Sequence, residues 1–318
     1  MQPDTERKPR NKIKFLIILI LLLTAMWQSL RAPKSFVGPV VITVSTGQPL
    51  STISQHLQEM HVIWSARLFE VFVISSGGEK RITTGDYFFD KPMPLLAVVN
   101  QFINNDFGVD RVRITVPEGF TLKDMAKLCE QKLPHCSSVN FLEKTKNMEG
   151  YFFPDTYLVF PSRNEDDLIQ KMQINFAKKT ETLFSGMSDK KINEVVTMAS
   201  IIEREAIGSA DRYIISGILY NRLKRDMALQ VDAPFYFLLG KSSSELTLKD
   251  LKIDSPYNTY INKGLPPTPI ASPGINSINA ALHPEQTEYL YYLHDSSGVA
   301  HYARTYAEHL KNKKKYIQ

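Results

Sequence analysis

The stretch Ala199-Ser200-Ile201-Ile202-Glu203 places a carboxylate directly after an apolar run. On a helical wheel, the apolar residues between positions 195 and 206 form one stripe, and Glu203 lies at the margin of that stripe. The stretch therefore predicts an amphipathic helix with one face in a core. A carboxyl group at such a margin loses part of its hydration, which suits a general acid. The alternative is a glutamate that is solvated or salt-bridged at the helix edge.

Four further motif blocks stand around this helix in the sequence. They are EGYFFPDTY at 149–157, LQVD at 229–232, SPYNTY at 255–260 and GLPPTPIASPG at 264–274. Together with the Glu203 block, and in this order, they resemble the YceG-like (MltG-type) endolytic murein transglycosylases. The likeness runs from about residue 110 to the C-terminus. One block departs from the family pattern Leu-Gln-Thr-Asp-Pro-Thr, because this chain has Val231 in place of the threonine and its proline one position later, at Pro234.

The resemblance implies an activity and a set of site residues. The activity is cleavage of the MurNAc-β-1,4-GlcNAc bond inside nascent peptidoglycan strands, which leaves 1,6-anhydroMurNAc ends. The active carboxylate of the family falls on Glu203. Five aligned residues would line the cleft and offer neutral hydrogen bonds or a carboxylate to the sugars: Gln230, Asp232, Tyr257, Asn258 and Tyr260. Asp232 has a second interpretation as the cap of a helix that begins at Ala233.

One carboxylate is enough for this chemistry. Glu203 and Glu205 project about 160° apart on a helix, so they do not flank one glycosidic bond. Ordinary glycosidases need two carboxylates. In a lytic transglycosylase, the C6 hydroxyl of the muramic sugar attacks its own anomeric carbon. Glu203 would first protonate the leaving oxygen and then, as a carboxylate, take the proton of the C6 hydroxyl.

The aromatic block at 149–157 adds three candidate sugar-binding residues. Pro154 disfavours a continuous helix there, which predicts a loop. Aromatic rings stack on pyranose faces while carboxylates accept hydroxyl hydrogen bonds, so Glu149, Asp155 and Tyr157 are candidates for the site. A buried core loop is the alternative.

The N-terminal residues predict a membrane anchor. The run 15–30 is uncharged and mostly Leu, Ile and Ala. As a helix it would span about 24 Å, short of the roughly 30 Å hydrocarbon core, but Lys14 and Arg31 can snorkel to extend it. A cleaved signal peptide is the competing interpretation. It is disfavoured because Trp27 and Gln28 occupy the place of a small-x-small cleavage site.

The charge of the flanking residues predicts the orientation of this anchor. Residues 1–14 form a basic tail ahead of the apolar run, which places them in the cytoplasm. We therefore expect a single-pass protein of the cytoplasmic membrane whose catalytic domain is extracytoplasmic (periplasmic), where peptidoglycan lies.

Composition limits the ligands to be expected. The formal net charge of +5 comes partly from the two termini, and no basic face with interleaved aromatics suggests nucleic acid. Cys129 and Cys136 stand seven residues apart, which leaves open whether they form a local disulfide in an oxidising compartment. Only His135 lies beside them, so we expect no metal site.

Hydrophobic periodicity predicts an α+β fold. The roughly 290 residues after the anchor suit two domains with real cores. Predicted strands cover 40–45, 81–89 and 111–116, and predicted helices cover 50–60, 66–74, 94–103, 122–131, 166–183, 190–205 and 211–223.

The passage VPEGFTLKDMA at 116–126 resembles the opening of a LysM-type module, in which a strand turns at Gly119 into a helix capped by Thr121. A plain strand–turn–helix spacer is the alternative. We expect a mixed α/β region at 31–108, a LysM-like module at 109–147 and a helix-rich catalytic domain at 148–318.

Three function classes follow. The first is the membrane-anchored lytic transglycosylase. The second is a non-catalytic peptidoglycan-binding scaffold with cell-wall synthases as partners; the complete Glu203 block argues against it, because a binding module needs no poised acid. The third is a pyridoxal-phosphate lyase, a name also attached to the family. It fits poorly because no lysine stands in a recognisable cofactor context, so no cofactor is expected.

Overall fold

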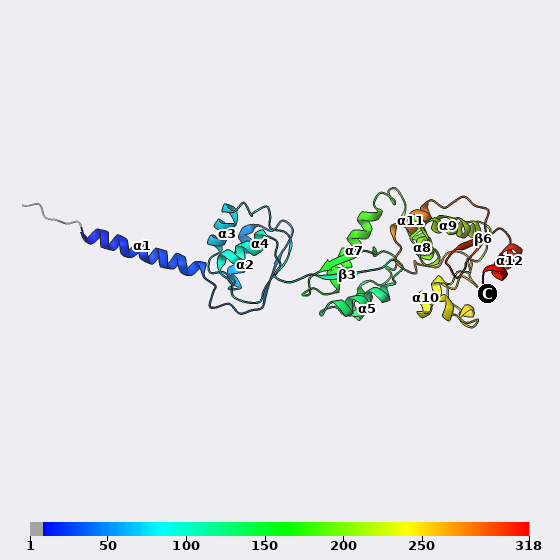
Figure 1. The fold of residues 1–318 in the computed structure, drawn as a ribbon, viewed down its shortest axis with the longest axis horizontal. Helices are drawn as coiled ribbons and strands as arrows, with labels where there is room; N and C mark the ends of the chain where they lie inside the picture. Colours follow the sequence, from blue (N-terminus) through cyan, green and yellow to red (C-terminus); the bar gives the residue numbers. More distant parts are fainter. Residues whose placement is uncertain (1–8, 318) are drawn as a thin grey trace, which may run out of the picture. The chain divides into compact units, whose positions relative to one another are not determined.

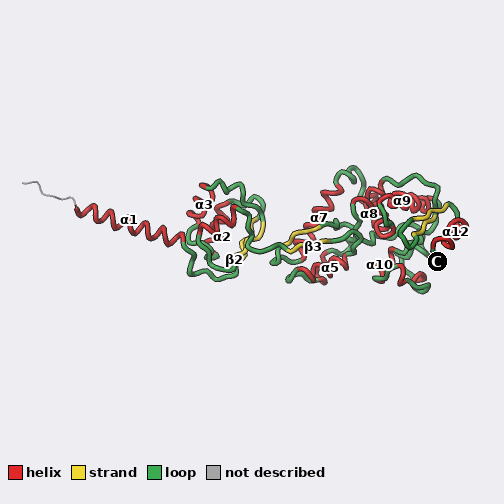
Figure 2. The backbone as a smooth tube through the Cα atoms, viewed as in Figure 1, coloured by secondary structure: helices red, strands yellow, loops and turns green. Residues whose placement is uncertain are grey.

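The computed structural model of the chain describes residues 9–317, without the side chains at positions 9–13, 22, 25, 209 and 210. The chain divides into two compact units, the first ending at Asp110 and the second starting at Arg111. Within the described residues, the strands form three separate two-stranded antiparallel sheets, and helices stand between them in the chain (Figures 1 and 2). This mixture of helices and separate antiparallel sheets agrees with the predicted α+β class.

Helix α1 comprises Pro9–Leu30 and contains the predicted anchor segment. Several of its large apolar side chains are exposed, among them Phe15, Leu19 and Trp27. Among the helices of residues 9–317, none is both long and apolar enough to cross a membrane.

Two strands and three helices form the rest of the first unit. They are β1 (Val40–Val44), α2 (Leu50–Glu59), α3 (Ala66–Ser75), β2 (Gly85–Phe89) and α4 (Leu95–Ile103). Burial alternates along β1, as its sequence predicts for a strand with one face in a core. Strand β2 starts four residues later than predicted, because Gly85 is already the partner of the last residue of β1, Val44. The rings of Tyr87 and Phe102 stack at 4.0 Å in the core.

The second unit begins with a sheet whose strands are far apart in the sequence. Its first elements are β3 (Val112–Thr115), α5 (Leu122–Lys132), α6 (Ser138–Lys144), β4 (Thr156–Val159) and α7 (Glu165–Thr180). Helix α5 starts at the predicted cap, where Thr121 and Asp124 form a capping box. Strand β4 lies beyond residue 147 yet pairs with β3, so the sheet extends outside the segment predicted to be LysM-like. The LysM-like identity of that segment stays a prediction.

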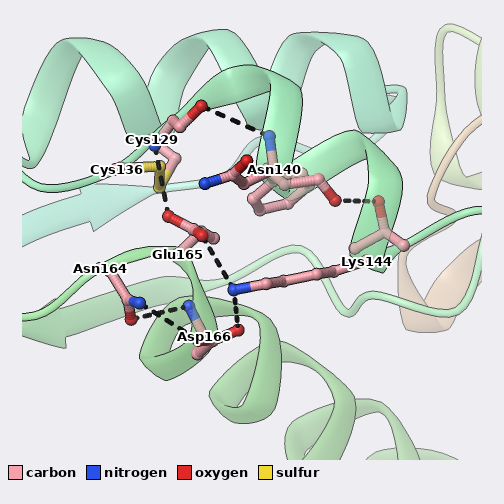
Figure 3. Close-up of polar contacts among 10 residues, drawn as sticks. Cys129, Cys136, Asn140, Lys144, Asn164, Glu165 and Asp166 are labelled. Carbon is pink, nitrogen blue, oxygen red and sulfur yellow. Dashed lines mark hydrogen bonds and ion pairs between the residues drawn. A yellow bond between two sulfur atoms is a disulfide. The ribbon is translucent and has the colours of Figure 1, made fainter.

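A disulfide and a buried carboxylate fix α6 in place (Figure 3). Cys129 and Cys136 are joined, which closes the turn between α5 and α6. Glu165, at the start of α7, is almost fully buried and accepts hydrogen bonds from the backbone N–H of Ser137 and from Lys144 Nζ, at 3.2 and 2.9 Å. The helix start of α7 is thereby bonded to both ends of α6.

The remainder of the second unit is mostly helical. Its elements are α8 (Asp189–Glu205), α9 (Ser209–Lys224), α10 (Ala233–Leu239), the 3-10 turns η1 (Ser243–Glu245) and η2 (Asp250–Lys252), α11 (Ile275–Leu282), β5 (Tyr291–His294), β6 (Ala300–Ala303) and α12 (Tyr306–Tyr316). Helix α8 packs against α9 and α11 (Figure 1). Its apolar stripe, which includes Val195, Met198 and Ile202, is fully buried there. The stripe predicted from the sequence is therefore the centre of this core.

Candidate active site

Glu203 lies in the last turn of α8, at the margin of the buried face. Ser188 caps the helix by accepting a hydrogen bond from the backbone N–H of Lys191, and the residues from Val195 to Ile202 are all buried. This burial sets the rotation of the helix, and the side chain of Glu203 keeps only 5% of its surface exposed. The predicted acid is thus held where little water reaches it.

Both carboxylate oxygens of Glu203 have a partner. Arg212, near the start of α9, donates from Nη2 to Oε1 at 3.1 Å. The backbone N–H of Gly274, just before α11, donates to Oε2 at 2.9 Å. Arg212 itself is oriented by a hydrogen bond from Nε to Ser277 Oγ, at 3.1 Å. The glutamate is therefore salt-bridged, as the alternative interpretation of the sequence had it, and three helices fix its position.

The proline-rich segment 264–274 packs along the same face of α8. Its residues Ile270 and Ser272 are fully buried. The backbone N–H of Ile270 donates to Ser200 Oγ at 3.0 Å. Ser200 and Glu203 are three residues apart on one helix face, so both bind this segment. The segment belongs to the core and supports Glu203.

A turn from the first part of the unit also reaches the acid. The backbone N–H of Gly119 donates to the carbonyl of Ser272 at 2.9 Å. The carbonyl of Gly119 accepts a hydrogen bond from Arg204 Nη1 at 2.8 Å. These bonds place Glu118 Oε2 4.0 Å from Arg212 Nη2, so Arg212 lies between two carboxylates.

The blocks at 229–232 and 255–260 are brought together by backbone and side-chain bonds. The N–H of Gln230 donates to the carbonyl of Thr259 at 3.0 Å. The hydroxyl of Tyr260 donates to Asp232 Oδ1 at 2.6 Å. Burial, and then this hydrogen bond, raise the pKa of Tyr260 above its ordinary value. Asp232 is the N-cap residue of α10, the position that the helix-cap interpretation gave it, but its side chain makes no cap bond.

The other candidates in these blocks differ in accessibility. Asn258 is 0% exposed, and its amide nitrogen donates to the carbonyls of Leu251 and Ile253 at 3.0 and 2.8 Å. The hydroxyls of Tyr257 and Thr268 lie 2.8 Å apart. Gln230 is exposed, and its φ is 50°. The structure thus leaves the side chain of Gln230 open to a ligand and encloses that of Asn258.

Glu149 is bonded to the start of α5. Its carboxylate is buried and accepts from the backbone N–H of Leu122 at 3.1 and 3.2 Å. Burial raises its pKa to about 7, although the N–H of Leu122 favours the charged form. Within the described contacts, its partner is the helix start and its role toward sugar stays a prediction.

Asp155 and Tyr157 meet at α7. Asn175 donates to Asp155 Oδ2 at 3.0 Å and to the hydroxyl of Tyr157 at 3.1 Å. Tyr157 is buried and donates to the carbonyl of Phe153 at 2.6 Å, and burial raises its pKa to about 12. Asp155 directly precedes β4 and Tyr157 lies within it, and their hydrogen-bond partners differ from those of Glu203.

Glu205 faces a different partner from Glu203, as predicted. It accepts from the backbone N–H of Ala233 at 3.3 Å and from the hydroxyl of Tyr292 at 2.7 Å. Burial raises its pKa, and the hydroxyl of Tyr292 opposes that change. Glu205 therefore holds the start of α10 and is not a second carboxylate beside the acid.

Sequence reasoning missed Arg212 and Glu118 as members of the site. Arg212 lies in a helix that was predicted, but the contact with Glu203 arises from the packing of α9 against α8. Glu118 belongs to the passage that was interpreted as the opening of a LysM-like module or as a plain strand–turn–helix spacer. Its signal was the turn glycine that follows it, Gly119, whose φ of +78° permits the close approach to Ser272.

The raised pKa of Glu149 predicts a pH-dependent stability. Because the folded state binds this proton up to about pH 7 and the unfolded state only up to about pH 4.5, stability falls as pH rises through that window, by up to about 3 kcal/mol. Denaturation of Glu149→Gln at pH 5 and pH 8 should show a smaller loss than the wild type. The exposed Glu181→Gln is the matched control and should keep the wild-type loss. Equal losses in wild type and Glu149→Gln would contradict the assignment.

The contrast between Asn258 and Gln230 predicts two different mutant phenotypes. Asn258→Ala removes a buried amide and leaves two carbonyls without their donor, so the free energy of unfolding should fall by about 2–3 kcal/mol. Gln230→Ala should change stability by less than about 0.5 kcal/mol. Chemical denaturation measures both. Equal destabilisation by the two substitutions would contradict the structural role assigned to the buried Asn258 and the accessible position assigned to Gln230.

The chain is similar to known proteins over most of its length. The YceG-like family matches residues 42–315. A Bacillus subtilis protein named endolytic murein transglycosylase is 37% identical over 307 residues, which are 87% of this chain and 85% of that protein. A Streptococcus pneumoniae protein of the same name is 35% identical over 173 residues, 52% of this chain and 31% of that protein. The crystal structure of a YceG-like protein from Listeria monocytogenes superimposes with a TM-score of 0.57 and 30% identity, covering 86% of this chain and 99% of that one. The chain belongs to the YceG-like family.

Proposed function

We propose that this protein is a lytic transglycosylase that cuts peptidoglycan strands internally. The observation that carries the proposal is the carboxylate of Glu203, which is almost fully buried and oriented by Arg212 and Gly274. The Bacillus subtilis relative, matched over most of both chains, is named an endolytic murein transglycosylase. A fixed and nearly dry carboxylate is what a single-acid mechanism requires.

Glu203 serves both steps of the proposed reaction. Protonated Glu203 gives its proton to the glycosidic oxygen as the bond to the anomeric carbon of the muramic sugar breaks. The C6 hydroxyl oxygen then bonds to that carbon, and the Glu203 carboxylate accepts the hydroxyl proton, which restores the acid. Arg212 and the N–H of Gly274 are placed to stabilise the carboxylate between the two steps. Glu205 takes no part, because it is bonded to the start of α10.

The proposed sugar-binding residues have unequal support. Gln230 is exposed and adjoins Asp232 and Tyr260, which form one hydrogen-bonded pair. These neighbouring polar groups suit acetamido and hydroxyl groups of the strand. Asn258 and Glu149 have their hydrogen bonds inside the protein, so we propose that they act by holding the chain in shape.

We also propose that α1 attaches the protein to the cytoplasmic membrane, with the N-terminus inside and the catalytic part outside. The support is the uncharged run 15–30 and the exposure of its apolar side chains. An apolar helix face exposed to this degree is unfavourable in water and suits lipid.

The attachment predicts how the protein fractionates. The full chain should sediment with membranes and resist carbonate extraction, whereas a chain that starts at residue 34 should be released, because it lacks the apolar helix. Quantitative blotting of both fractions measures this. Release of the full chain by carbonate would contradict insertion into the bilayer.

The proposed acid predicts the products. Digestion of uncrosslinked glycan strands by the wild type should give internal fragments with 1,6-anhydro ends, and Glu203→Gln should be slower by at least about 100-fold, because its amide cannot give or take the proton. Mass spectrometry identifies the ends. Glu194→Gln is the matched control, being an exposed glutamate on the same helix. Reducing ends would indicate a hydrolase, and intact strands with the wild type would favour the scaffold function.

A further inference from the structure

We propose that Glu118 is a positioning residue of the active site, which shares the guanidinium of Arg212 with Glu203 and so limits how far Arg212 favours the charged form of the acid. This inference rests on the proposed function, since it assigns a role in the chemistry of Glu203. It concerns a residue from the segment before α5, ahead of the predicted catalytic domain.

The guanidinium of Arg212 is shared by two carboxylates. Its Nη2 lies 3.1 Å from Glu203 Oε1 and 4.0 Å from Glu118 Oε2. The side chain of Arg212 is 14% exposed and that of Glu118 is 47% exposed, so Glu118 stands on the solvent side of the pair. One positive charge between two negative charges stabilises each carboxylate less than it would stabilise one alone.

The backbone that carries Glu118 is held on both sides. The N–H of Gly119 is bonded to the carbonyl of Ser272, and the N–H of Ser272 to the carbonyl of Phe120, at 2.9 and 2.8 Å. Arg204 donates to the carbonyl of Gly119. These bonds fix the residue next to Glu118 against the segment that also supports the acid, so its place near Arg212 is built into the fold.

Gly274 lies against both carboxylates. Its N–H donates to Glu203, and a methyl group on its Cα would collide with the carboxylate of Glu118. The lack of a side chain at this position therefore lets Glu118 approach. The φ of Gly274 is −77° and its ψ is 170°, a conformation that alanine adopts freely. Glycine is therefore needed here for the close approach of Glu118 and not for its backbone conformation.

The electrostatic setting agrees with this geometry. Burial raises the pKa of Glu118, the charge of Glu203 raises it further, and the charge of Arg212 lowers it. Of the other charged groups on α8, Arg204 is engaged with the carbonyl of Gly119 and the ring of Tyr236, and Glu205 is bonded to α10. From α11 and its cap, the contacts come from the N–H of Gly274 and the hydroxyl of Ser277, which carry no charge.

The test is the pH dependence of kcat for strand cleavage by the full chain. Without the negative charge of Glu118, Arg212 pairs with Glu203 alone and favours its carboxylate over the protonated acid. Glu118→Gln should move the alkaline limb down by about 0.5 pH unit and lower kcat there about threefold, with KM unchanged. Glu143→Gln, an exposed glutamate of α6, is the matched control and should leave the limb in place.

A second variant tests the geometry without removing the charge. Gly274→Ala keeps the N–H to Glu203 but displaces the flexible carboxylate of Glu118, so the limb should move in the same direction. Adding it to Glu118→Gln should give no further shift, because both changes act through one contact. If Glu118→Gln fails to fold, Gly274→Ala still tests the positioning role of Glu118.

The outcomes separate this inference from the proposed function. A wild type that produces no anhydro ends contradicts the function itself. A wild type that cleaves, beside a Glu118→Gln profile that coincides with it, overturns the positioning role alone. A raised KM with an unmoved limb also overturns it, since that result assigns Glu118 to substrate contact.

Discussion

Two hydrogen bonds to the carboxylate of Glu203 connect the three helices on which the site depends. The bond from Arg212 comes from α9, and the bond from Gly274 comes from the start of α11. Charge-assisted bonds of this kind are shorter and stronger than bonds between neutral groups, and they gain strength where water is scarce. The apolar stripe of α8 supplies that dry setting, because its residues are fully buried against the same two helices. Burial and pairing at Glu203 are therefore two results of one packing arrangement.

Much of the fold follows from local sequence signals. The helix predicted at 190–205 is found as Asp189–Glu205, because its apolar stripe and its Ser188 cap are both encoded within one short stretch. The late elements α11, α12, β5 and β6 were not predicted, and α10 was considered only as the helix that Asp232 could cap. Strand β4 was assigned to a loop because its strand character comes from pairing with β3, more than 40 residues earlier. Pairing at such a distance cannot be deduced from β4 alone, whereas β3 was predicted from its own periodicity.

The site was predicted in part for the same reason. Glu203 could be chosen from its own helix, and the resemblance to a family indicated the blocks around Gln230 and Tyr260, which do meet. Arg212 could not be chosen, since nothing in its helix shows that the side chain will point at a carboxylate nine residues earlier. Glu149 was placed beside aromatic residues by sequence, and the structure shows it bonded to the start of α5 instead. The sequence motifs thus showed which residues lie close together in the chain, but not which side chains contact Glu203.

The bond between Arg204 and Gly119 has a consequence for how this protein can be divided. A carbonyl 85 residues upstream is held by the residue that follows the acid, and the same turn exchanges two backbone bonds with Ser272. Strand β3 lies just ahead of this turn and is the partner of β4. Within the second unit, the part before residue 148 is therefore no removable spacer. Exchanging it between relatives would replace the turn that is bonded to Arg204 and Ser272, and any recombination between such proteins would need to keep this turn and the Ser272 segment from the same parent.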